Sequence, residues 1–82
     1  MKNNPQTELD NLLYNIKWLR QHNGLSKKQM TDILGVSLKT LNKIERGEMP
    51  PRLGASVLYN ISVHFGISSS KQFEKKLSEN IN

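Results

Sequence analysis

The sequence contains no cysteine and only two histidines, His22 and His64. A chain without thiols has no disulfide and no thiolate metal site, and two isolated histidines do not form a ligand cluster. No apolar stretch approaches the roughly 20 residues that a membrane span requires, and residues 1–7 are too polar for a signal peptide. We therefore expect a cytoplasmic protein without a metal, a cofactor or contact with a membrane.

Residue combinations that carry catalysis are also missing. The sequence shows no carboxylate pair, no nucleophile beside a general base and no phosphate-binding loop, so we expect no enzyme. The chain has 82 residues, of which 35% are hydrophobic and 23% charged. This length suits a single domain with one modest core and leaves no room for a second lobe.

Negative charge is scarce, and the formal net charge is +5. The imbalance is concentrated in residues 27–52, where six basic residues oppose three acidic ones for a net charge of +3. Residues 53–70 carry no formal charge. A basic centre favours a polyanionic partner, although the same lysines could simply form a solvated helix face.

Apolar spacing and capping residues predict an all-α protein, a compact bundle of four to five short helices. In the first helix, residues 8–21, the apolar residues recur at i, i+3, i+4 and i+7. Ser26 and Gln29 form a capping box for a second helix that stops at Gly35, and Ser37 caps a third, which reaches Arg46. We expect a fourth helix over residues 55–65 and a weaker one over residues 70–80.

The second and third helices form a helix-turn-helix pattern, because only Gly35 and Val36 separate the second helix from the cap of the third. The second helix of such a pair is presented to a DNA major groove. In the third helix, Leu41 and Ile44 share the inward face with Glu45. The opposite face carries groups that donate to phosphates and base edges, with asparagine suited to adenine and lysine to guanine. These groups are Lys39, Asn42, Lys43 and Arg46.

The segment from about Ile16 to Ile67 closely resembles the lambda-repressor-like (Cro/Xre) family of helix-turn-helix regulators. The resemblance lies in Leu25-Ser26-x-x-x-Met30-x-x-Ile33-Leu34-Gly35-Val36-Ser37-x-x-Thr40-Leu41-x-x-Ile44-Glu45-Arg46-Gly47. It implies a sequence-specific, nucleoid-associated repressor that inserts the helix of residues 37–46 into the major groove. It also implies a homodimer on a palindromic double-stranded operator with half-sites about 34 Å apart.

The resemblance assigns roles to individual residues. Lys27 and Arg52 match positions that contact phosphates, and Lys28 adds a third charge beside the backbone. Arg20 and Glu45 match a pair that ties the first helix to the third, either as a buried structural ion pair or as a weak surface pair. The predicted DNA-binding residues are Lys27, Lys28, Ser37, Leu38, Lys39, Thr40, Asn42, Lys43 and Arg52.

Three features depart from the family pattern. Thr31 replaces a usual alanine, so its hydroxyl must find a backbone acceptor or the second and third helices must separate slightly. Leu38 occupies an often polar position, where it either contacts a thymine methyl or packs against the second helix. The loop from Gly47 to the fourth helix is slightly long, which weakens the assignment of Arg52.

We divide the chain into a flexible N-terminal arm (residues 1–7), a DNA-binding domain (8–68) and a C-terminal helix and tail (69–82). The alternative function is a protein-interaction module, such as an antitoxin, controller or adaptor. Tyr14 and Trp18 lie opposite the leucine stripe of the first helix. They either form a partner surface or are covered by Phe73 and Leu77.

Overall fold

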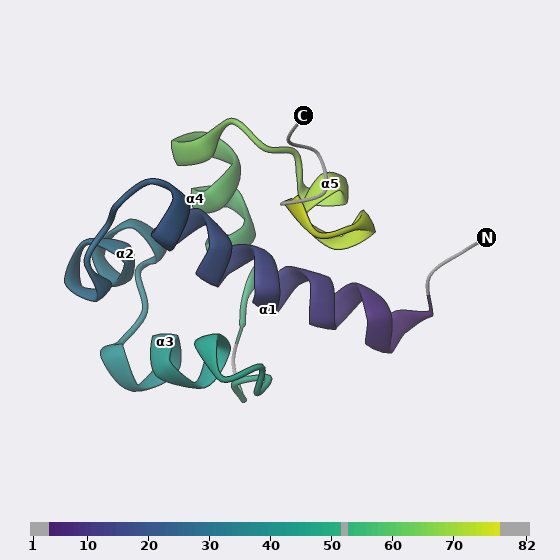
Figure 1. The fold of residues 1–82 in the computed structure, drawn as a ribbon, viewed down its shortest axis with the longest axis horizontal. Coiled ribbons are helices and arrows are strands. Elements are labelled where there is room, and N and C mark those ends of the chain that lie inside the picture. Colours follow the sequence, from purple (N-terminus) through teal and green to yellow (C-terminus); the bar gives the residue numbers. More distant parts are fainter. Residues whose placement is uncertain (1–3, 52, 78–82) are drawn as a thin grey trace.

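Helix α1 (Pro5–His22) lies across the molecule and packs against α3 (Leu38–Glu45) on one side and α5 (Ser69–Glu74) on another (Figure 1). Helix α2 (Lys27–Leu34) packs between α3 and α4 (Ala55–Phe65). The computed structural model describes residues 4–51 and 53–77, and these contain helices but no β-strand. The predicted all-α bundle of short helices is therefore confirmed.

Helix α1 begins at Pro5, three residues before the predicted start. Asn4 caps it, because its side-chain oxygen accepts a hydrogen bond of 2.8 Å from the backbone N–H of Thr7. Proline suits the first turn, where a helix leaves backbone N–H groups without intrahelical partners. The predicted N-terminal arm of residues 1–7 is therefore too long, since residues 5–7 belong to α1.

The core is built from the apolar stripes that the sequence predicts. Side chains from α1, α2, α3 and α4 meet in one cluster, which Leu77 joins from beyond α5. The side chains least accessible to solvent in this cluster are Leu12, Ile16, Met30, Leu34, Leu41, Ile44 and Ile61. Burial of these stripes orients α3 relative to α1 and α2, because this arrangement removes each of the side chains from contact with water.

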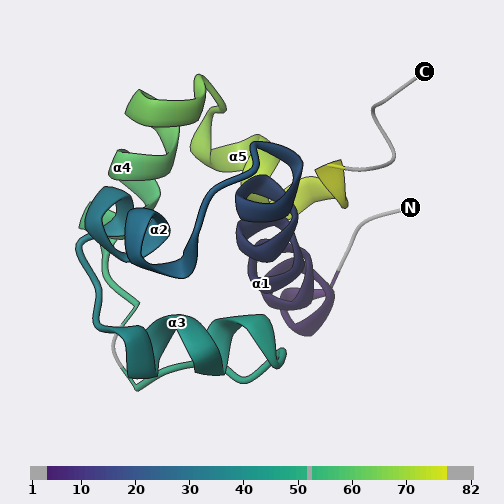
Figure 2. The same ribbon diagram turned by 60° about the vertical axis from the view of Figure 1, so that its left-hand side comes forward.

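The turn between α2 and α3 depends on Gly35, which closes α2 in the left-handed conformation with φ of 74°. The backbone N–H groups of Gly35 and Val36 both donate to the carbonyl of Thr31. Asn60 of α4 also donates to the carbonyl of Leu34 at 3.1 Å. The end of α2 is thus satisfied by hydrogen bonds, and the chain turns directly into α3 (Figure 2).

The predicted C-terminal helix over residues 70–80 is wrong in extent, since α5 ends at Glu74 and Lys75 is extended. Asn15 of α1 explains this end. Its amide donates to the carbonyls of Gln72 (2.8 Å) and Lys75 (3.0 Å), and its oxygen accepts from the N–H of Leu77 (2.7 Å). These bonds replace the next helical turn, and residues 78–80 of the prediction lie outside the described residues.

None of the helices described here has the length and hydropathy needed to cross a membrane.

Candidate nucleic-acid interface

Helix α3 has two distinct faces, as its sequence predicts. Leu41 and Ile44 are buried in the core. Lys39 is exposed, and Asn42 and Lys43 are half-buried. Within the described part of the chain, the side chain of Lys39 forms no hydrogen bond or ion pair. The outward face of α3 therefore combines cationic and amide groups on a helix whose other face is held by the core.

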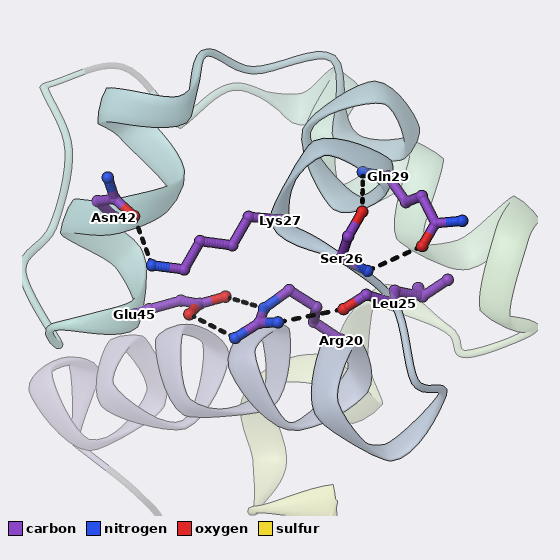
Figure 3. A network of polar contacts seen from close by, with 7 residues as sticks. All are labelled: Arg20, Leu25, Ser26, Lys27, Gln29, Asn42 and Glu45. Carbon is purple, nitrogen blue, oxygen red and sulfur yellow. Dashed lines mark hydrogen bonds and ion pairs between the residues drawn. The ribbon is translucent and has the colours of Figure 1, made fainter.

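The inward carboxylate of Glu45 pairs with Arg20 of α1 through two hydrogen bonds (Figure 3). Arg20 Nε lies 2.5 Å and Nη2 3.0 Å from the two carboxylate oxygens, and Nη1 donates to the carbonyl of Leu25 at 3.1 Å. The side chains of Arg20 and Glu45 are only 16% and 8% exposed. The hydrogen bonds to Glu45 raise the pKa of Arg20 further above its ordinary value. Arg20 and Glu45 therefore form a largely buried ion pair, the first of the two alternatives.

The start of α2 is held by the predicted capping box (Figure 3). Ser26 Oγ accepts from the N–H of Gln29 at 3.0 Å, and the Gln29 side chain accepts from the N–H of Ser26 at 2.8 Å. This cap places Lys27 at the first position of α2. From there Lys27 Nζ donates a 2.8 Å hydrogen bond to Asn42 Oδ1 on α3.

Sequence reasoning missed this contact between α2 and α3. The sequence predicts a phosphate contact for Lys27 and a base contact for Asn42, as two independent residues. They are 15 positions apart, so no helical periodicity relates them. The only available signal was that the turn between the two helices brings the first turn of α2 close to the exposed side of α3.

The other candidates on α2 and in the turn have structural partners. Lys28 Nζ pairs with Asp32 one turn later at 3.0 Å, and both side chains are well exposed. Thr31 donates to the carbonyl of Lys28 at 2.7 Å, so of the two alternatives for its hydroxyl the backbone acceptor is the one observed. Ser37 caps α3 by accepting from the N–H of Thr40 at 3.1 Å, and their hydroxyls also bond to each other.

Leu38 opens α3 with a side chain that is 53% exposed. Leu38 is not among the residues that pack into the core cluster, so apolar surface at the start of α3 faces solvent. At the other end of α3, Arg46 pairs with Glu48. The hydrogen bond from Arg46 is the main reason why the pKa of Glu48 is lowered. Arg52, the remaining predicted phosphate contact, lies outside the described residues.

Tyr14 and Trp18 line a groove on α1 that also borders the end of α3. Tyr14 is 38% exposed, and Lys76 Nζ lies 5.1 Å from the centre of its ring. Trp18 stacks on His22 and packs against the edge of the core. Lys76 thus lies over the Tyr14 ring, which stays partly exposed, whereas Trp18 is half-buried against the core.

Within residues 4–51 and 53–77, no three histidine, aspartate or glutamate side chains gather where they could hold a metal ion.

Comparison with known families supports this geometry. A family model described as helix-turn-helix, of the Cro/C1 type, matches residues 16–72, a span that runs from the middle of α1 into α5. No match was found among curated proteins or among solved structures. The family indicates a DNA-binding transcription regulator. With α2, the Gly35 turn and α3 arranged as described, the chain belongs to the lambda-repressor-like (Cro/C1-type) helix-turn-helix family.

Proposed function

We propose that this protein is a sequence-specific repressor that inserts α3 into the major groove of double-stranded DNA. The observation that carries the proposal is the two-sided anchoring of α3. Leu41, Ile44 and the Arg20–Glu45 pair hold one face, while Lys39, Asn42 and Lys43 lie away from the core. A helix held in this way presents its side chains to base edges with little loss of conformational freedom on binding.

Positive charge near α3 is expected to add to the affinity for DNA. Lys27 and Lys28 open α2, the helix that packs against α3, and from there they can approach the phosphates that flank the groove. Each phosphate neutralised contributes about 0.9 to the slope of log affinity against log salt. Binding is therefore expected to weaken steeply as salt rises, and an affinity that stays flat from low to moderate salt would contradict the proposal.

The protein would act as a homodimer on a palindromic operator. Tyr59 and Val63 lie one turn apart on α4 and are 67% and 65% exposed, although both are apolar or aromatic. They belong to residues 53–70, which carry no formal charge, in a chain of net charge +5. Because two copies of a basic protein repel each other least through an uncharged face, this part of α4 is the surface we assign to a second copy.

The experiment that tests the function is selection of bound duplexes from a random pool. An enriched palindrome would give the specificity and the half-site spacing together. Lys39→Ala and Lys43→Ala should relax the base preference. Lys71→Ala is the matched control, since it removes the same charge from α5, which packs on α1 and lies apart from α3 (Figure 1). Lys71→Ala should leave the base preference unchanged. If Lys39→Ala and Lys43→Ala lost affinity without any change in preference, our base contacts would be wrong.

A second candidate function is a protein-interaction module. It is favoured by the groove that contains the half-exposed Tyr14 ring and the cationic side chains of Lys17 and Lys76. In that case the random pool would yield no enriched duplex, and a purified protein partner would lose affinity on Tyr14→Ala. The same substitution should leave DNA binding unchanged if the first proposal is correct.

A further inference from the structure

The bond between Lys27 and Asn42 changes what the exposed face of α3 can recognise. It joins the first residue of α2 to the middle of α3 at 2.8 Å (Figure 3). The fold holds both residues of this bond in place. The capping box of Ser26 and Gln29 holds the start of α2, and the core holds α3. The pair is therefore built across the helix-turn-helix itself.

The chemistry of lysine sets the orientation of the Asn42 amide. An ammonium group only donates hydrogen bonds, so the atom that faces Lys27 must be the side-chain oxygen, and the Asn42 NH₂ group then points to the other side. Lys27 uses one of its three N–H groups in this bond and keeps two. The pair thus offers several N–H donors to a ligand, while its acceptor, Asn42 Oδ1, is already bonded to the Lys27 ammonium.

Adenine and guanine respond differently to such a pair. A lone asparagine matches adenine, because its oxygen accepts from the adenine N6 amino group while its NH₂ donates to N7. Beside Lys27, the N6 amino group would meet an ammonium that is itself a donor. Guanine instead offers two neighbouring acceptors, N7 and O6, in the major groove.

We propose that Lys27 and Asn42 act as one donor unit that selects guanine, and not adenine, at the base pair facing Asn42. This inference rests on the proposed function of α3 in the major groove. Asn42 NH₂ and Lys27 Nζ would share the N7 and O6 acceptors. Lys27 is then a specificity residue and not only a phosphate contact.

Lys28 provides a matched control on the same helix. It carries the same charge one position later, but its ammonium pairs with Asp32 within α2 and forms no hydrogen bond with α3 among the described residues. Its replacement removes one positive charge from the same end of the molecule and leaves the Asn42 amide untouched. A difference between the two lysines therefore separates base selection from attraction to phosphate.

The test compares duplexes selected from a random pool by the wild type and by Lys27→Met, Lys28→Met and Asn42→Ala. Methionine keeps most of the apolar stem and removes the donor. The position read by Asn42 is the one at which Asn42→Ala loses its preference. We expect the wild type to enrich guanine there, and Lys27→Met to shift the guanine-to-adenine affinity ratio by about tenfold or more towards adenine. Lys28→Met should weaken all duplexes while the ratio stays unchanged.

Two results would overturn this inference alone. One is wild-type enrichment of adenine at that position. The other is a Lys27→Met variant that weakens all duplexes equally and keeps the guanine preference. If no duplex is enriched by the wild type, the proposed function and this inference fall together. Circular dichroism melting of each variant establishes that it is folded before its preference is compared.

Discussion

Replacing Glu45 by alanine tests how α3 is held in place. The substitution removes both hydrogen bonds to Arg20 and leaves the guanidinium with only the carbonyl of Leu25 as a described partner. Since the Arg20 side chain is 16% exposed, most of it stays out of contact with water when its counter-ion is gone. A charge that is neither paired nor hydrated destabilises the folded state.

The expected loss follows from this burial. Breaking a fully buried ion pair by removing one partner costs about 3–5 kcal/mol. Arg20 keeps one backbone acceptor and some contact with solvent, so we expect a free energy of unfolding lower by about 2–3 kcal/mol. For a domain of this size each kcal/mol corresponds to about 4–8 °C in melting temperature, which predicts a decrease of roughly 10–20 °C.

Thermal and urea unfolding followed by circular dichroism would measure the loss, and Glu48→Ala is the control. Glu48 also pairs with an arginine near the end of α3, but that pair is well exposed, so little change in melting temperature is expected. A double substitution, Arg20→Met with Glu45→Leu, should recover part of the loss because it removes both charges. Equal effects of Glu45→Ala and Glu48→Ala would refute the reasoning.

Three further substitutions have defined outcomes. Asn15→Ala removes the partner of two carbonyls and of the Leu77 N–H, and should lower the free energy of unfolding by about 2–4 kcal/mol; hydrogen exchange as slow in the C-terminal segment as in the wild type would contradict this. Gly35→Ala places a Cβ at φ of 74° with only an ordinary contact of 3.7 Å to Asn60 Nδ2, so backbone strain of about 1 kcal/mol should appear in urea unfolding. Ser37→Ala removes the cap bonded to Thr40 and should cost about 1 kcal/mol, whereas Ser37→Asp should largely restore stability.

Most of the fold could be predicted, because the helix bounds depend on residues that are close together in the sequence. Apolar spacing and caps placed α2, α3 and α4 close to their observed bounds. The C-terminal end was not predictable in this way. Phe73 and Leu77 have helical spacing, but buried hydrogen bonds from Asn15 of α1 end the helix at Glu74. Nothing in the spacing of α5 reveals a partner almost 60 positions away.

The candidate site also has features that the sequence predicts and features that only the folded chain shows. The apolar pattern alone sets which face of α3 turns inward, because burial of Leu41 and Ile44 leaves Lys39 and Lys43 on the other side. The resemblance to a known family predicted the pairing of Arg20 with Glu45, and the folded chain established that the pair is largely buried.

Amino-acid order was therefore sufficient for the helices, for the turn at Gly35 and for the polarity of each face, since these follow from interactions within a few residues. Packing of α2 against α3 was needed to bring Lys27 to Asn42 and to exclude Leu38 from the core. Hydrogen bonds between side chains distant in sequence form only after the helices are docked. For this reason the orientation of the Asn42 amide, and with it the base that we assign to it, belongs to the tertiary structure.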